Sequence, residues 1–346
     1  MSVRRLYLDR GLGESRGVVT LDGRPERLLI RRDGDDPKLR LGARCVARVA
    51  SLEPALATAF LDLGGGAEAI LPFRADAKPV RGQTIEVEIR SEPRRGKLPI
   101  ARLLGEGEGA PRLLGEARDL AEELRGFARD ADLVEGRAAR EAADEAEAEA
   151  LEVLHPIPGG GLIAVEPTRA LTAIDVDLGE RKGADAKRVT RAANLAALGL
   201  AARLLRLKGI GGIVVVDLVG RGHDGNALMA AARAAFGPDN PGVAIGPVGR
   251  FGTMELSLPR RVRPLAEILC REDGRLAERT LAQRLIRRIE AEAAAQGGAR
   301  LVARCAPGVE REARALAPKL AERIGARFTI TADPSLPQER LEVSAA

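Results

Sequence analysis

Two apolar runs, LTAIDVD at residues 171–177 and IVVVDL at residues 213–218, each carry an aspartate near the end of a predicted buried strand. Between them, the basic amphipathic stretch Lys187–Lys208 is long enough for a helix that returns the chain to a neighbouring strand. Ligands of open α/β sheets bind where such strands end. Carboxylates gathered there can hold Mg²⁺ through hard oxygen ligands. Asp175 and Asp217 are therefore the first candidates for a metal site.

A lone aspartate at a strand end has a simpler explanation, because Asp often caps a following turn or helix. Here there are two, and Asp177 projects from the same strand face as Asp175. A metal held by two carboxylates could orient water and offset charge on a scissile phosphate. We therefore expect Asp175, Asp217 and Asp177 to be catalytic, with Asp175 and Asp217 as the Mg²⁺ ligands.

Composition is that of a globular protein large enough for two or three domains. The chain has 346 residues, of which 45% are hydrophobic and 30% are charged. Its formal net charge is +5, and most of the positive residues are arginine. The planar fork of arginine suits phosphate, although arginine richness can also reflect biased genomic composition. The charge by itself therefore favours a nucleic-acid ligand only slightly over a chain whose arginines have no such role.

Cysteine usage and hydropathy indicate the compartment. Cys45, Cys270 and Cys305 lie far apart without any Cys-x-x-Cys pair, which argues against a zinc site and a disulfide framework and fits a reducing cytosol. The first residues lack an apolar run of signal-peptide length, and no later run approaches a membrane span. A cytoplasmic protein without membrane association is expected.

Residues 39–102 predict an OB-type barrel, a fold that often binds single strands. Five short strand candidates with turns between them are Arg44–Leu52, Ala57–Leu63, Ala67–Pro72, Thr84–Ser91 and Leu98–Leu103.

An aromatic residue on this barrel is predicted to face outward. Ala59, Leu61 and Leu63 alternate with polar positions, so the strand period of two puts Phe60 on the polar face. There it could stack on a base, an interaction worth roughly 1–3 kcal/mol. The alternatives are a neighbouring domain that covers the ring or a register slipped by one residue. Arg95 and Lys97 in the last hairpin would contact phosphate, unless they form an ordinary charged turn.

The remaining segments are assigned by their periodicity. A strand and a hairpin around Asp22-Gly23 are expected over residues 4–32, and one or two helices with an acidic face over 113–152. Residues 162–259 predict an α/β layer with mixed strands. The C-terminal pattern predicts helix 276–296, strand 300–305, helix 309–324 and strand 327–331, a βαβ packing unit or dimerisation element.

Several basic residues near the candidate site have two explanations each. Lys187, Arg188 and Arg191 would line an RNA channel, or form an ordinary solvated helix face. Arg250 in Arg-Phe-Gly would point at phosphate, or serve as a structural loop arginine. His223-Asp224 is equally well explained as the polar approach to a helix, so His223 receives no catalytic role.

Several motifs of the chain resemble those of the ribonuclease E/G family. Residues 57–72 (ATAFLDLGGGAEAILP) resemble its S1 domain, and residues 164–175 (AVEPTRALTAID) resemble its catalytic strand pair. Asn194-Leu195, residues 205–207 (LRL), residues 211–217 (GGIVVVD) and Arg250-Phe251-Gly252 follow in the family's order.

The resemblance implies a Mg²⁺-dependent endoribonuclease of DNase I-like architecture that acts on single-stranded RNA in processing or decay. It implies Asp175 and Asp217 as metal ligands, and Phe60 and Lys97 as S1-domain contacts to RNA. In an α/β (α+β overall) chain, the expected units are an N-terminal strand and hairpin (1–36), an S1 domain (37–103), a helical connecting segment (104–157), a DNase I-like catalytic domain (158–262) and a C-terminal unit (263–346).

The chain also departs from the family pattern. Asp177 stands where the family has Asn, and Ile70 where it has the next S1 aromatic. The family's 5′-monophosphate sensor and zinc-link cysteine pair have no counterpart, so neither 5′-end sensing nor a zinc-bridged tetramer is expected, while a homodimer is left open. Two other functions compete with the nuclease: an RNA-binding or regulatory protein without catalysis, and a phosphohydrolase of small nucleotides.

Overall fold

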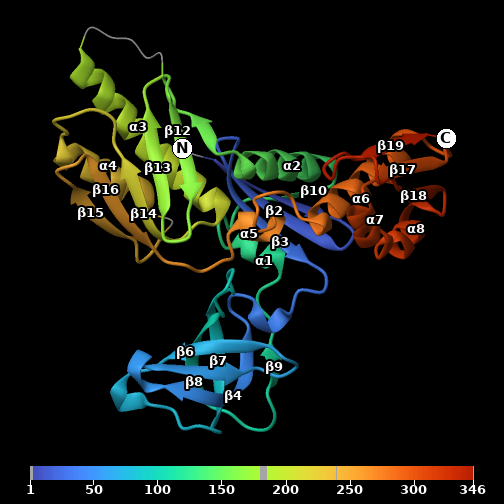
Figure 1. The fold of residues 1–346 in the computed structure, drawn as a ribbon, viewed down its shortest axis with the longest axis horizontal. Coiled ribbons are helices and arrows are strands. Elements are labelled where there is room, and N and C mark those ends of the chain that lie inside the picture. Colours follow the sequence, from blue (N-terminus) through green and yellow to red (C-terminus); the bar gives the residue numbers. More distant parts are fainter. Residues whose placement is uncertain (1–2, 180–184, 239, 346) are drawn as a thin grey trace.

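The computed structural model describes residues 3–179, 185–238 and 240–345. These form four sheets (Figure 1). An N-terminal sheet lies at the centre, with an α/β unit on one side, a small C-terminal unit on the other, and a barrel that projects from the body. In the described part of the chain, no helix is long and apolar enough to cross a membrane.

The central N-terminal sheet confirms the predicted strand and hairpin and adds a fourth strand. Its order is β10-β1-β2-β3. The strands are β1 (Arg4–Arg10), β2 (Glu14–Leu21), β3 (Arg24–Arg32) and β10 (Leu133–Glu135). Val18, Leu28 and Ile30 on one face join the core of the α/β unit, whereas Leu6 and Leu8 on the other pack with helix α1 (Leu120–Arg125). The sheet therefore carries cores on both faces.

The predicted five-stranded barrel is confirmed. Its strands are β4 (Arg44–Glu53), β5 (Thr58–Asp62), β6 (Glu68–Pro72), β7 (Thr84–Ser91) and β8 (Ile100–Glu106). They pair in the order β5-β6-β8-β7-β4, and β4 pairs back onto β5, which closes the ring. A short strand that was not expected, β9 (Arg112–Gly115), adds to β4. Small and branched side chains such as Ala59, Leu61 and Val87 fill the interior.

The predicted α/β layer with mixed strands is confirmed, and it forms a six-stranded sheet with the order β11-β12-β13-β14-β16-β15. Its strands are β11 (Leu154–Pro156), β12 (Leu162–Pro167), β13 (Thr172–Asp177), β14 (Gly212–Asp217), β15 (Ala244–Val248) and β16 (Thr253–Leu258). Only β13 and β14 run parallel to one another, because helix α3 (Ala186–Lys208) carries the chain back between them. Helix α4 (Gly225–Phe236) follows β14.

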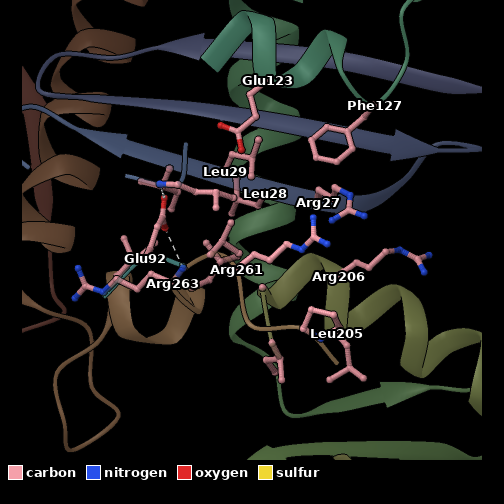
Figure 2. Close-up of a pocket in the computed structure, with 18 of the residues that line it drawn as sticks. Arg27, Leu28, Leu29, Glu92, Glu123, Phe127, Leu205, Arg206, Arg261 and Arg263 are labelled. Carbon is pink, nitrogen blue, oxygen red and sulfur yellow. Dashed lines mark hydrogen bonds between the residues drawn. The ribbon is translucent and has the colours of Figure 1, made fainter. Parts of the chain in front are cut away.

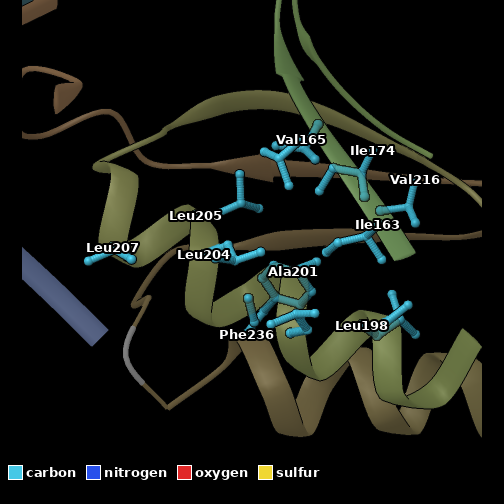
Figure 3. Packing of buried hydrophobic residues seen from close by; sticks show 14 of the residues in the cluster. Ile163, Val165, Ile174, Leu198, Ala201, Leu204, Leu205, Leu207, Val216 and Phe236 are labelled. Atoms are coloured by element: carbon cyan, nitrogen blue, oxygen red, sulfur yellow. The ribbon is translucent and has the colours of Figure 1, made fainter. Parts of the chain in front are cut away.

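One face of this sheet is covered by α3 and α4. Ile174 and Val216 from the strands pack with Leu198, Ala201 and Phe236 from the helices (Figure 3). The apolar positions of α3 recur every three to four residues, so one side of the helix is buried along its length. The helices leave the opposite face of the sheet free for other contacts.

The C-terminal unit differs in two respects from its prediction. It contains α5 (Leu265–Leu269), α6 (Glu278–Ala295), β17 (Leu301–Cys305), α7 (Pro307–Arg314), α8 (Ala317–Ile324), β18 (Phe328–Ala332) and β19 (Glu342–Ala345). The single helix predicted over 309–324 is wrong: Pro318 cannot donate a backbone hydrogen bond, so it sits in the first turn of a second helix. The parallel β17–β18 pair confirms the βαβ pattern, and β19 adds an antiparallel edge.

Helix α2 (Arg137–Leu151) and buried charges join the N-terminal sheet to the C-terminal unit. Arg16, only 1% exposed, pairs with Asp9 at 2.6 Å and with Glu147 of α2 at 3.1 Å. Glu14 forms ion pairs with Arg32 at 2.6 Å and with Arg287 of α6 at 2.8 Å. Three separate segments of the chain thus meet in one ionic network.

For Arg16 and Glu147, the opposite charges of the network outweigh the effect of burial on the pKa. Burial alone would lower the pKa of Arg16, but Asp144, Glu147 and Asp9 raise it above its ordinary value. For Glu147, burial acts to raise the pKa, and Arg287, Arg284 and Arg16 outweigh it and lower the pKa. Removing one member would leave the others charged and buried.

Replacing Arg16 tests how far the body depends on this network. Arg16→Met should lower the unfolding free energy by about 3–5 kcal/mol, since it leaves buried carboxylates without their partner. The matched control is Arg137→Met, which removes an exposed ion pair with Glu141 within one helix and should cost far less, because water screens that pair. Urea unfolding measures both. Similar losses in the two variants would contradict the assigned role.

Candidate functional site

The two aspartates predicted as metal ligands are direct neighbours in the sheet. In the parallel pairing of β13 with β14, Asp175 lies opposite Asp217. Adjacent strands are about 4.8 Å apart. Both side chains alternate with buried residues, Ile174 and Val176 in β13 and Val216 in β14, so both project from the same face. The structure therefore brings together two carboxylates that are 42 positions apart in the sequence.

The carboxylate pair is exposed and has no ion-pair partner in the part of the chain that the structure describes. Asp175 and Asp217 are exposed on the face that α3 and α4 do not cover. Across residues 3–179, 185–238 and 240–345, neither carboxylate accepts a hydrogen bond or an ion pair from a protein group. Two adjacent negative charges without a counter-charge attract a cation. The explanation that each aspartate caps a turn or helix does not hold for these two.

Asp177 is placed differently. It lies on the same face as Asp175, opposite Leu162 of β12. Its Oδ1 accepts a hydrogen bond of 2.8 Å from the backbone N–H of Gly179, so this carboxylate does cap a turn. In the described residues, no group of three or more His, Cys, Asp or Glu side chains is arranged to hold a metal. Asp177 therefore does not complete a three-residue metal cluster with Asp175 and Asp217.

A buried asparagine holds the backbone that follows Asp217. The Asn194 amide nitrogen donates to the Val219 carbonyl oxygen at 3.0 Å, and the Val219 N–H donates to the Asn194 Oδ1 at 3.1 Å. Asn194 is 1% exposed, among the apolar residues of α3. Sequence reasoning did not single it out as a site residue, although a polar residue within the apolar stripe of a helix was the available signal. It ties helix and strand end together beside the carboxylates.

Helix α3 carries basic side chains to the end of the sheet where the pair lies. Helix α3 has 23 residues and is about 35 Å long, while β13 has six residues and spans about 20 Å. The first turn of α3, with exposed Lys187 and Arg188, therefore extends past the strand ends, as Figure 1 shows. Arg191 pairs with Asp224 at 3.3 Å.

His223 and Asp224 match the helix-approach explanation. Asp224 Oδ1 accepts the Ala227 N–H at 3.1 Å and caps α4. His223 lies beside Gly252, and its Nε2 is buried without a hydrogen-bond partner among the described residues. The imidazole is close to the backbone after Asp217, because the Leu218 N–H donates to the Gly252 carbonyl oxygen at 3.1 Å.

The barrel presents Phe60 as the strand alternation predicted. Phe60 is 38% exposed and pairs with Ile70 of β6, which pairs in turn with Ile100 of β8. Next to this row is a groove of about 490 Å³. Its lining includes four basic residues that sequence reasoning did not select, Arg74, Lys78, Arg90 and Arg102. An aromatic side chain and a basic groove thus share one side of the barrel.

The last barrel hairpin is turned toward the body. The Arg95 N–H donates to Glu267 Oε2 at 2.6 Å, and its guanidinium donates to the Cys270 carbonyl oxygen at 3.4 Å. Arg95 therefore anchors the barrel to the C-terminal unit. Lys97 is exposed and has no such contact within the described residues.

Barrel and carboxylate pair lie at opposite ends of the α/β sheet. The barrel contacts the body where the Glu92 N–H donates to the Arg261 carbonyl oxygen at 2.8 Å, beyond the end of β16. Asp217 pairs with Thr253, at the start of β16. The structure therefore groups the aspartates with α3 and the β15–β16 turn, and it does not bring Phe60 to them.

A cavity of about 230 Å³ lies where β3, the C-terminal end of α3 and the segment after β16 meet (Figure 2). Arginines are prominent in its wall, but acidic partners accompany several of them. Arg31 pairs with Glu123 at 2.7 Å, and Arg206 pairs with Glu26 at 2.7 Å. Arg27 lies over the Phe127 ring at 4.5 Å. The cavity is at the C-terminal end of α3, away from the aspartates, and is a charged seam between barrel and body.

The chain is thus an α/β protein with an OB-type barrel and a carboxylate pair at a strand end. Residues 119–261 match the model of the ribonuclease E/G family, a segment that includes the carboxylate pair and excludes the barrel. This segment of the chain is therefore similar to the ribonuclease E/G family.

Among its relatives is ribonuclease E of Haemophilus influenzae, 31% identical over 147 residues, which are 40% of this chain and 16% of that protein. Ribonuclease E of Escherichia coli is 33% identical over 114 residues, 32% of this chain and 11% of the relative. The ribonuclease E/G-like chloroplastic protein of Arabidopsis thaliana is 33% identical over 122 residues, 34% of this chain and 12% of the relative. The chain therefore matches only a small part of each of these proteins.

The unpaired charges predict a stability effect. Asp217→Asn should raise the unfolding free energy by about 0.5 kcal/mol in low salt with a chelator, because like charges on neighbouring strands repel. The gain should shrink as salt screens the pair. Glu255→Gln is the control, since Glu255 is exposed on β16 and faces Val215 rather than a carboxylate. Thermal unfolding across a salt series measures both, and a destabilised Asp217→Asn variant would contradict the prediction.

Proposed function

We propose that the protein is a Mg²⁺-dependent endoribonuclease that binds single-stranded RNA and cleaves it during RNA processing or decay. The observation that carries the proposal is the lateral pairing of Asp175 with Asp217, both exposed and without a counter-charge among the described residues. This pair lies inside the segment that matches the ribonuclease E/G family. The relatives are named ribonucleases, which supports RNA as the substrate class.

The donor set suits Mg²⁺. This ion is usually held by one or two carboxylates together with water and substrate phosphate oxygens, rather than by a complete protein cage. Asp175 and Asp217 are the residues that would hold it. When bound, the ion would offset charge on the scissile phosphate and provide a position for the attacking water. The absence of a third ligand among the described residues fits a site that RNA itself completes.

The chain's own cationic residues would position the RNA backbone. Lys187 and Arg188 project beyond the strand ends, and Arg250 stands at the β15–β16 turn. Phosphate contacts from such residues hold a strand in place without reading its sequence. The carboxylate pair then meets a phosphodiester that is already flanked by positive charge.

The barrel would hold a second part of the same RNA. Phe60 offers a face to a base, and Arg74, Lys78, Arg90 and Arg102 line the adjacent groove. Because barrel and carboxylates lie at opposite ends of the sheet, the RNA must be extended to contact both. An unpaired strand can do so more readily than a folded one, which favours single-stranded substrate.

The first test removes one carboxylate. Asp217→Asn should lower cleavage of an unstructured RNA in Mg²⁺ by more than about a hundredfold, equivalent to about 3 kcal/mol of barrier, while RNA binding is retained. Chelation of Mg²⁺ should abolish cleavage by the unmodified protein. Gel assays of labelled RNA measure cleavage, and filter binding measures affinity.

Two matched variants sharpen this test. Glu255→Gln changes an acid on the same face outside the pair and should cleave normally. Asp177→Asn should also remain active, since an amide oxygen can still accept the Gly179 N–H. RNA binding without cleavage by the unmodified protein would instead identify an RNA-binding protein. Hydrolysis of small nucleotides that RNA does not inhibit would identify a phosphohydrolase.

A separate test concerns the barrel. Phe60→Ala should weaken binding of single-stranded RNA by about tenfold, the loss expected for one stacked base. Binding should also fall steeply as salt rises, because phosphate contacts release counterions. Leu56→Ala is the control, as Leu56 is also exposed on the barrel but lies outside the Phe60 row. Equal affinities of the Phe60→Ala and unmodified proteins would remove the barrel surface from the proposal.

A further inference from the structure

The tight turn between β15 and β16 presents two side chains to solvent. The Gly252 N–H donates to the Gly249 carbonyl oxygen at 3.0 Å, and the Gly249 N–H donates to the Thr253 carbonyl oxygen at 2.8 Å. Gly252 has a φ of 86°, a value that favours glycine. Arg250 and Phe251 therefore occupy the two central positions of the turn.

The aromatic side chain at the tip of this turn belongs to no buried core of the described residues. Phe251 is 78% exposed, the most exposed of the large hydrophobic residues in the described chain. Central turn positions favour Gly, Asn, Asp or Pro, so turn geometry does not call for a phenyl ring. The ring lies outside every buried hydrophobic cluster. Neither turn formation nor core packing explains its presence.

Among the described residues, the side chain that lies over the ring is the cationic Arg250. The Arg250 guanidinium carbon lies 4.5 Å from the centroid of the Phe251 ring. This contact is a cation–π interaction, which limits the orientations open to the ring. Aromatic rings and arginine planes are the groups on which single-stranded nucleic acids stack their bases.

The turn lies immediately beside the carboxylate pair. Thr253, which follows the turn, pairs with Asp217, and the Leu218 N–H donates to the Gly252 carbonyl oxygen at 3.1 Å. The exposed ring therefore stands at the end of the strand that carries one of the two aspartates. A nucleotide next to a phosphate held at the carboxylates would be within reach of it.

We infer that Phe251, oriented by Arg250, is a stacking platform for a base next to the phosphodiester held at Asp175 and Asp217. This inference rests on the proposed function and adds a second point of base contact, distinct from Phe60 on the barrel. Stacking reads the face of a base rather than its edge, so the platform places the strand without selecting a sequence.

A second copy of the chain is a weaker candidate for the occupant. The cores of protein interfaces are depleted of charged residues. The sheet face beside Phe251 carries exposed Asp175, Asp217 and Glu255, and the turn itself carries Arg250. One exposed ring within a charged surface fits a nucleic acid better than a protein partner.

The test uses the absence of tryptophan from the chain. Phe251→Trp in the Asp217→Asn background places the only tryptophan of the chain at the tip of the turn, and the Asp217→Asn change prevents cleavage during the titration. Phe60→Trp in the same background reports on the barrel, and Val3→Trp, at an exposed position near the N-terminus, is the negative control. A short unstructured RNA is the probe, and tryptophan quenching is the measurement.

Saturable quenching at position 251, with the midpoint of RNA binding, is the expected result, together with a flat signal at position 3. In the Asp217→Asn background, Phe251→Ala should weaken binding about tenfold, and Phe251→Tyr should restore it. Quenching at position 60 without quenching at position 251 would overturn this inference and leave the proposed RNA binding intact.

Two other outcomes would also overturn it. RNA that neither binds nor quenches at position 60 or 251 would remove the proposed function together with the inference. An emission shift at position 251 that depends on protein concentration without RNA, accompanied by a dimer in sedimentation that Phe251→Ala abolishes, would show that a second copy covers the ring.

Discussion

The parallel pairing of β13 with β14 is the constraint on which the site depends. If β14 were shifted by one residue relative to β13, Asp217 would lie on the buried face of the sheet and Val216 on the open face. The register is held because Ile174 and Val216 pack under α3, and because Asn194 ties the backbone after β14 to the same helix. Core packing on one face therefore determines the geometry of the charges on the other.

Charge is handled in opposite ways in two parts of the molecule. In the body, Arg16 and Glu147 are buried and each has partners, so the network joins three segments of the chain. At the sheet end, Asp175 and Asp217 are exposed, adjacent and without partners among the described residues. A structural network gains from satisfying every charge. An ion or phosphate site requires charges that the protein leaves unsatisfied.

Local pattern predicted most of the elements, and the errors have local or long-range causes. Strand alternation placed Phe60 outward, and the turn signals separated the five barrel strands as the structure has them. The break at Pro318 was readable, since proline starts helices more readily than it continues them. The added strands β9, β10 and β19 were not readable. Each is only three or four residues long, and each exists because a distant strand offers it an edge.

The sequence by itself determined the barrel, the α/β layer and the two aspartates as candidates, because hydrophobic period and turn chemistry act over short stretches of chain. Tertiary structure alone decided that Asp175 faces Asp217 across neighbouring strands and that Asp177 is taken up by a turn. It alone placed Phe60 far from this pair and Phe251 beside it. These relations depend on strand register and on which edges meet, and both follow from packing between segments that are distant in the sequence.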